Sequence, residues 1–118
     1  MPSKDFYLEN IEKELAAARE ALAVGNDGKA RVCARRAAGQ ALTWYLSTHP
    51  KPAWGTDALT QLKHLRDDSE FSQSSRDAAL RLTTKVSDQF TYQFSTDPLE
   101  DANIIIRTIT QLMESDVA

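Results

Sequence analysis

The stretch KARVCARRAAGQALTWYLS, residues 29–47, decides the predicted fold of this chain. With about 100° of rotation per residue in a helix, it gathers small and aromatic side chains in one broad sector. That sector consists of Ala30, Cys33, Ala34, Ala37, Ala41, Trp44 and Tyr45. A narrower stripe on the opposite side holds Val32, Gly39 and Leu46 at intervals of seven residues, with Leu42 nearby. A helix that is apolar on two sides must bury both, so we expect either that other helices surround it or that a second subunit covers its far side.

Amphipathic segments before and after this stretch predict the rest of the fold. Residues 4–24, 57–66 and 76–94 and the segment from Pro98 onward each repeat apolar side chains at three- and four-residue steps, which places them on one helical face. No segment shows the strict alternation of a half-buried strand. The sequence therefore predicts an all-α protein, an up-and-down bundle of four long helices plus one short helix, the short one being 57–66.

Turn and cap residues set the expected helix boundaries. Gly25 is a suitable stop for the first helix. The last helix has the clearest start, because Pro98 suits the first helical position and Glu100 completes an Asp-x-x-Glu capping box. The residues expected to cap the N-termini of the later helices are Asp27, Thr56, Ser74 or Ser75, and Asp97.

Size and composition favour one ordinary globular domain over residues 1–118. The formal net charge is -3, so bulk attraction to nucleic acid is not expected. No apolar run approaches the ~20 residues of a membrane span, and charged residues interrupt the N-terminal stretch where a signal peptide needs an apolar core. Cys33 is the one cysteine, which gives no reason to expect an oxidising compartment. We therefore expect a cytoplasmic protein without membrane contact.

Four cations are concentrated within two turns of the segment 29–47, namely Lys29, Arg31, Arg35 and Arg36. Such a cluster can hold an anion or a nucleotide phosphate in a groove beside the helix. It can also serve the fold, with the aliphatic stems covering apolar surface and the charged ends pairing with acidic residues of the first helix. The acidic residues available for this are Glu12, Glu14 and Glu20.

The other residues that could take part in catalysis or binding form no catalytic or metal-binding pattern. His49 and His64 have no partners at the spacing of a metal site, so we expect both on the surface and neither metal nor cofactor. Cys33 has the setting of a small core residue rather than of a nucleophile. Trp44, Tyr45 and Trp54 flank a proline-containing loop, where they could stack on a base or pack in the core or in a dimer contact.

The order of four short stretches resembles a known family. The helix that reads GKARVCARRAAGQAL over residues 28–42 follows a helix of similar length and ends in the proline-containing loop. After that loop come TDAL at 56–59, FTYQ at 90–93 and DPLEDA at 97–102. Over nearly its whole length the chain resembles the HEPN domains, the "higher eukaryotes and prokaryotes nucleotide-binding" family.

The resemblance implies a bundle of four or five helices that is often a symmetric homodimer. Many HEPN proteins accompany a minimal nucleotidyltransferase in toxin–antitoxin pairs, while others are ribonucleases or bind nucleotides or protein partners. The ribonuclease signature of the family, an arginine followed four to six residues later by a histidine, is absent from this sequence. The Arg-Tyr pair frequent near the end of the penultimate long helix is Thr91-Tyr92 here. Catalysis is therefore not expected.

We predict a non-catalytic HEPN-like helical module that binds a nucleotide or a protein partner, such as a minimal nucleotidyltransferase. One alternative is a divergent ribonuclease, with Arg35 or Arg36 on the phosphate and Tyr92 near the leaving group, and another is a purely structural helical adaptor. The residues predicted to bind a nucleotide or anion are Lys29, Arg31, Arg35, Arg36 and Tyr92. The residues predicted for a homodimer or partner interface are Val32, Gly39, Leu42 and Leu46.

Overall fold

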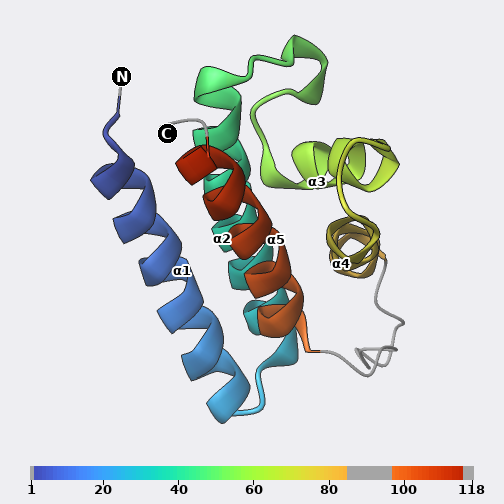
Figure 1. The fold of residues 1–118 in the computed structure, drawn as a ribbon. Helices are drawn as coiled ribbons and strands as arrows, with labels where there is room; N and C mark the ends of the chain where they lie inside the picture. Colours follow the sequence, from blue (N-terminus) through green and yellow to red (C-terminus); the bar gives the residue numbers. More distant parts are fainter. Residues whose placement is uncertain (1, 85–96, 116–118) are drawn as a thin grey trace.

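A central helix, α2, organises the structure, a computed structural model that describes residues 2–84 and 97–115. The elements in chain order are α1 (Lys4–Ala23), α2 (Asp27–Thr48), the 3-10 turn η1 (Pro52–Trp54), α3 (Ala58–Asp67), α4 (Gln73–Thr83) and α5 (Pro98–Ser115). α1 runs antiparallel to α2, and α5 runs beside α2 on another side (Figure 1). α3 also packs on α2, and α4 bridges α3 and α5. The predicted all-α bundle is confirmed.

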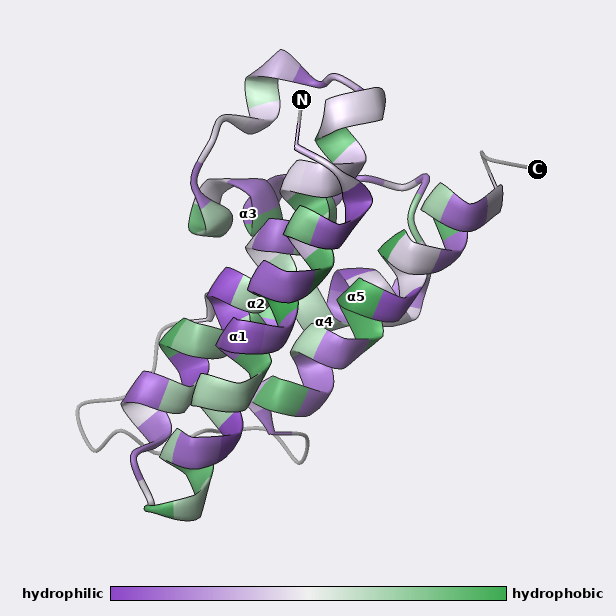
Figure 2. Ribbon diagram, turned by 90° about the vertical axis from the view of Figure 1, so that its left-hand side faces the viewer, coloured by the Kyte–Doolittle hydropathy of each residue, from purple (hydrophilic) through white to green (hydrophobic). Residues whose placement is uncertain are grey.

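Small side chains explain why three helices can pack on α2. Ala34, Ala37, Ala38 and Ala41 are fully buried, so the backbones of the neighbouring helices approach closely. Helices α1, α3 and α5 thus cover most of both apolar sides of α2, while Val32 stays exposed. Each of the long helices carries hydrophobic and hydrophilic bands along its length (Figure 2). The fold therefore buries the hydrophobic bands between α1, α2 and α5.

The turn between α1 and α2 follows the expected glycine stop. Gly25 has a φ of 76°, a conformation that a residue without Cβ adopts at little cost. Its N–H donates to the carbonyl oxygen of Leu22 at 3.1 Å, and the N–H of Asn26 donates to that of Ala21 at 2.8 Å. These bonds satisfy carbonyls left over at the end of α1.

Three of the predicted N-caps are wrong by one or a few residues. Asn26, rather than Asp27, caps α2 by accepting from the N–H of Lys29 at 3.1 Å. Asp57, rather than Thr56, caps α3. Asp57 offers a carboxylate where Thr56 offers only a hydroxyl. Asn26 and Asp27 are equally suited to the cap position, but α2 begins at Asp27, which therefore serves as an acidic residue in the first turn. The cap predicted at Asp97 is confirmed, since its Oδ1 accepts from the N–H of Glu100 at 2.7 Å.

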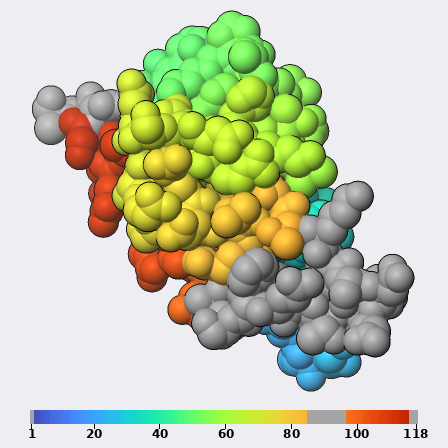
Figure 3. All heavy atoms as spheres, turned by 90° about the vertical axis from the view of Figure 1, so that its right-hand side faces the viewer, coloured from blue at the N-terminus to red at the C-terminus, as the bar shows by residue number. Residues whose placement is uncertain are grey.

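α4 begins earlier than predicted, and ends earlier as well. Ser72 caps it, because Ser75 is fully buried and its hydroxyl is hydrogen-bonded to that of Thr108 at 2.7 Å. The helix ends at Thr83 and the backbone of Thr84 is extended, whereas the sequence predicted a helix as far as residue 94. The rest of that prediction, including Tyr92, lies outside the described residues. α3 and α4 form much of the face seen in Figure 3.

Candidate functional site

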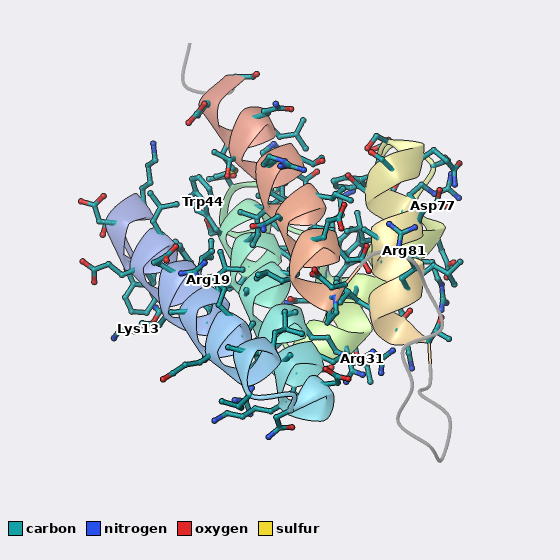
Figure 4. All side chains as sticks on the ribbon, turned by 90° about the horizontal axis from the view of Figure 1, so that it is seen from below. Lys13, Arg19, Arg31, Trp44, Asp77 and Arg81 are labelled. Atoms are coloured by element: carbon teal, nitrogen blue, oxygen red, sulfur yellow. The ribbon has the colours of Figure 1, made fainter. Side chains whose placement is uncertain are left out.

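Arg31 and Arg35 turn from α2 toward the C-terminal end of α4. Nη2 of Arg31 donates to the carbonyl oxygen of Arg81 at 3.2 Å, and Nε of Arg35 donates to that of Leu82 at 2.8 Å. Figure 4 shows Arg31 on the side of α2 that faces α4. Carbonyls in the last turn of a helix have no partner inside the helix and carry partial negative charge, so cations are favourable there. These two arginines therefore fasten α4 to α2.

A buried ion pair lies beside this contact. Nε of Arg81 on α4 donates to Oδ1 of Asp101 on α5 at 2.8 Å, and Asp101 is completely buried. The pair joins α4 to α5 as the arginines of α2 join α4 to α2. Removing one member of a buried pair typically costs about 3–5 kcal/mol, because the other charge is left without compensation. We name Arg31, Arg35, Arg81 and Asp101 the arginine cluster.

Arg36 takes a different direction from its two neighbours and lines a groove beside α2. The polar section of this α2 groove has a volume of about 280 Å³. It is lined by Glu14 from α1, by Arg36, Gly39, Gln40 and Thr43 from α2, and by Thr56, Ala58 and Gln61 from the start of α3. The section thus contains one cation, one carboxylate, two amides and two hydroxyl groups, which are groups that recognise a small polar ligand.

A close helix contact forms one wall of the groove. A Cβ placed on Gly39 would lie only 2.6 Å from the Cβ of Ala58. Only glycine therefore allows the start of α3 to come this close to α2. The contact brings Gln61, one turn further along α3, into the wall of the groove.

Gln61 is the most unusual residue of the groove. It is 2% exposed, and its Nε2 donates to the carbonyl oxygen of Gly55 at 3.2 Å. Its Oε1 is buried and accepts no hydrogen bond from the described part of the chain. Leaving a buried acceptor without a partner costs about 1–3 kcal/mol, so such a group in a folded protein calls for an explanation.

The groove continues along α2 in a second, less polar section. This section also has a volume of about 280 Å³ and shares Thr43, Thr56 and Gln61 with the first. Its other lining residues are Tyr7, Leu46, Ser47 and Gly55. From Arg36 to Ser47 the helix rises about 16 Å, so the two sections form one elongated site with the charged groups at one end.

The remaining residues predicted for binding or for an interface occupy varied positions. Lys29 is exposed in the first turn of α2, Val32 is exposed, and Leu46 is partly buried against the core. Gly39 and Leu42 are buried within the chain itself. On this side of α2, Val32 and part of Leu46 are therefore what a partner could reach.

The other predicted positions mostly match the structure. Cys33, Trp44 and Trp54 are buried, so their interpretation as core residues is confirmed. His64 is only partly exposed, because its ring stacks on Trp54 with 5.8 Å between centroids. His49 likewise stacks on Tyr45 at 4.4 Å. Both histidines thus pack on aromatic rings rather than standing free on the surface.

Lys51 is enclosed by aromatic rings and a carboxylate. Its Nζ lies 5.1 Å from the ring centroid of Trp54 and 5.7 Å from that of Phe71, and donates to Oδ2 of Asp68 at 3.1 Å. Burial raises the pKa of Asp68, but hydrogen bonds from the Glu70 N–H and from Lys51 outweigh it and hold the pKa of this carboxyl below its usual value. This cation is already partnered within the chain.

Within residues 2–84 and 97–115, no group of three or more histidine, cysteine or acidic side chains could hold a metal ion.

No helix in the described part of the chain is long and apolar enough to cross a membrane.

Comparison of the chain with family models, with curated proteins and with solved structures finds no match.

The sequence singled out Arg36 as a binding residue and Gly39 and Leu46 as interface residues, but it did not point to the other residues of the groove, above all Gln61. A signal was present, because Gln61 lies three residues after Ala58 and four before Leu65, on the edge of the helix that faces the core. A polar residue on that edge marks either a satisfied buried amide or a binding site. Thr43, Thr56 and Glu14 are ordinary surface residues in the sequence, and only the packing of α3 against α2 brings them together.

Proposed function

We propose that this chain is a non-catalytic HEPN-like module that binds a nucleoside monophosphate in the α2 groove. The observation that carries the proposal is that Arg36, the amide of Gln40 and the hydroxyl-bearing Thr43 and Thr56 line the same groove. A guanidinium is suited to phosphate, and amide and hydroxyl groups are suited to the polar edge of a base or to a ribose. The HEPN resemblance supports the same class of ligand.

The charge of the groove favours a ligand with few negative charges. Glu14 and Arg36 line the same polar section, so the section has no surplus positive charge. A monophosphate can pair with Arg36, whereas a triphosphate brings more negative charge than one guanidinium beside a carboxylate can balance. We therefore expect AMP to bind more tightly than ATP.

The positions of the arginines support binding without catalysis. A divergent ribonuclease was predicted to combine Arg35 or Arg36 with Tyr92. Arg35 donates to a carbonyl of α4, while Arg36 lines the groove on another side of α2. Neither His49 nor His64 lines the groove, so the residue type most often used as a general base is not at hand there, and Glu14 is the one carboxylate that lines it.

The test is titration calorimetry of the chain with AMP, GMP, CMP, UMP and ATP. We expect at least one monophosphate to bind, and Arg36→Gln to weaken that binding about tenfold, equivalent to one charge-assisted contact. Arg107→Gln is the matched control, because Arg107 is exposed on α5 and does not line the groove. Absence of binding by all four monophosphates, or equal affinity of wild type and Arg36→Gln, would overturn the proposal.

A further inference from the structure

We propose that the aromatic rings around Lys51 form a binding site for a quaternary ammonium group, a site that the chain's own lysine occupies until such a ligand displaces it. The groups of this site, which we name the Lys51 cage, are the rings of Tyr45, Trp54 and Phe71 and the carboxylates of Asp68 and Glu70. None of them lines the α2 groove, so the inference does not depend on the proposed function.

Three aromatic rings surround the ammonium group of Lys51. Its Nζ lies over all three, at 5.1 Å from the ring centroid of Trp54, 5.7 Å from that of Phe71 and 5.9 Å from that of Tyr45. The face of an aromatic ring attracts a cation through its quadrupole, and cages of several rings are suited to quaternary ammonium groups. A lysine that only fastened a loop would need one carboxylate and none of these rings.

Two carboxylates complete the cage. Nζ of Lys51 donates to Oδ2 of Asp68 at 3.1 Å and lies 3.9 Å from Oε2 of Glu70. Burial by itself would lower the pKa of the Lys51 ammonium, but the hydrogen bond to Asp68 and the charges of the neighbouring acidic groups outweigh it and raise that pKa. The surroundings therefore favour a positive charge at this position.

The distances from Nζ to the rings match an ammonium that carries methyl groups. A methyl carbon lies about 1.5 Å from its nitrogen and packs about 3.5–4.0 Å from a ring, which places the nitrogen about 5.0–5.5 Å from that ring. The three distances around Lys51 lie between 5.1 and 5.9 Å, so a layer one methyl group thick separates the nitrogen from each ring. A quaternary ammonium fills that layer and has no N–H that needs an acceptor, whereas a lysine has three.

The protein core, rather than Lys51, fixes the three rings. Tyr45 belongs to α2, Trp54 to η1 and Phe71 to the connection between α3 and α4, and all three are part of the buried core. The ring of Phe71 meets that of Tyr45 edge-on, with 5.6 Å between centroids, and lies 6.1 Å from that of Trp54. The cage therefore keeps its shape when the lysine leaves, and a ligand meets a preorganised site.

Lys51 is placed so that it can leave the cage. It lies in the loop between α2 and η1, and its side chain is 26% exposed, so solvent reaches the position of the ammonium directly. Its ion pairs are with the side chains of Asp68 and Glu70, which serve another cation equally well. A released lysine regains its rotamer freedom and its hydration. Lys51 thus acts as an internal competitor for the ligand.

The experiment titrates choline by calorimetry into the wild-type chain and into Lys51→Ala, which empties the cage. We expect Lys51→Ala to bind choline at least about tenfold more tightly than the wild type does, because the internal competitor is gone. The neutral isostere of choline, in which a quaternary carbon replaces the nitrogen, has the same shape and should bind neither protein measurably. Lys63→Ala is the matched control, because Lys63 is exposed on α3 and its removal should leave binding as in the wild type.

A second variant tests the carboxylate of the cage. Asp68→Asn, added to Lys51→Ala, removes the charge, while its side-chain oxygen still accepts from the N–H of Glu70 as Asp68 does at 2.9 Å. The double variant should bind choline about tenfold more weakly than Lys51→Ala. Equal affinity of the two variants would overturn the part that the proposal gives to Asp68.

A quaternary ammonium can come from a free small molecule or from a trimethylated lysine of another protein. Titration of Lys51→Ala with a peptide that contains Nε-trimethyl-lysine distinguishes them: tighter binding of the peptide than of choline supports a protein source, and the reverse order supports a small molecule. The same peptide with an unmethylated lysine should bind more weakly than either ligand, since it leaves the methyl layer empty.

Two results would overturn the proposal. One is that Lys51→Ala binds no choline, and the other is that it binds choline and the neutral isostere equally. If Lys51→Ala does not fold, the wild type decides: choline should bind it weakly, in competition with Lys51, and the isostere should not bind. Absence of choline binding by the wild type would then overturn the proposal.

Discussion

Arginine residues have different roles on the two sides of α2. On the side of α4, Arg31 and Arg35 donate to carbonyl oxygens, and the neighbouring Arg81 pairs with buried Asp101. On the side of α1 and α3, Arg36 lines an open groove together with the polar residues Gln40, Thr43 and Thr56. The arginine cluster is committed to holding helices together, whereas the α2 groove has polar groups left for a ligand.

The difference teaches that position in the fold, rather than residue type, decides the role of a cation. The three arginines stand within five residues of one another in the sequence. Arg35 and Arg36 are adjacent, but about 100° of helical rotation separates their directions. This contrast predicts that substitutions on the first side change stability, and that substitutions of polar groups on the second side change binding.

The largest effect is expected from Asp101→Asn. The variant leaves the guanidinium of Arg81 without its carboxylate, so the free energy of unfolding should fall by about 3 kcal/mol or more. Urea unfolding measures it. Asp77→Asn is the control: Asp77, on α4 (Figure 4), is only partly buried and accepts a hydrogen bond from the exposed Gln73. Similar losses in both variants would contradict the division between the two sides.

Gly39→Ala should also lower stability, by no more than Asp101→Asn does. Its Cβ would press on Ala58, and such overpacking costs about 1–3 kcal/mol, so the midpoint of urea unfolding should fall. Gly28→Ala, in the same helix, is the control: a Cβ there meets nothing within 4 Å, and the change should leave stability the same or slightly higher. The idea that close packing shapes the groove fails if Gly39→Ala is as stable as the control.

Arg35→Met and Arg36→Met form the direct test of the contrast. Loss of a charge-assisted bond to Leu82 should make Arg35→Met less stable by about 1.5–3 kcal/mol. Arg36→Met should stay within about 0.5 kcal/mol of the wild type, since its side chain is exposed. Calorimetry with AMP should show the reverse order, with binding weakened about tenfold in Arg36→Met and unchanged in Arg35→Met. Equal effects on both properties would remove the distinction.

The smallest effect is expected for the ion pair of Lys51 with Asp68. The setting of this lysine is intermediate between the arginine cluster and Arg36 in the groove. The pKa of Asp68 is lower in the folded chain than in the unfolded chain, so its contribution to stability is present above pH ~4 and is lost as the pH falls through the folded pKa. Asp68→Asn should therefore lose less stability between pH 5 and pH 2 than the wild type (roughly the range in which carboxylates titrate). Parallel pH profiles of the two proteins, followed by urea unfolding, would show that the Lys51–Asp68 pair adds nothing.

The sequence was informative where local chemistry decides the structure. The small residues from Ala30 to Ala41 predicted the central place of α2, and Gly25 and Asp97 marked helix ends correctly. It was less informative where two adjacent residues compete for one position, as Asn26 and Asp27 do at the start of α2. Which of the two residues caps the helix depends on where the chain enters it, and the N-cap preference of a residue type does not specify that position.

The candidate site was predictable only in part. The four cations of α2 drew attention to the right helix, but their directions depend on α4, whose position is set by contacts with α3 and α5. The position of Gln61 in the groove depends on its hydrogen bond to Gly55 and on the close approach of α3 to Gly39. Such tertiary contacts have no counterpart in the local sequence, so the groove could not have been assembled from it.

The attachment of α1 has a consequence for the exchange of ligand. α1 packs mainly on α2 and has little contact with α5, and it ends at the Gly25 turn. A helix held along one side, next to a turn that can act as a hinge, opens at a lower free energy than the rest of a protein. Because α1 supplies Tyr7 and Glu14, its opening would expose the whole length of the groove at once. Amide hydrogens of α1 should then exchange with deuterium sooner than those of α2, and a bound nucleotide should slow them.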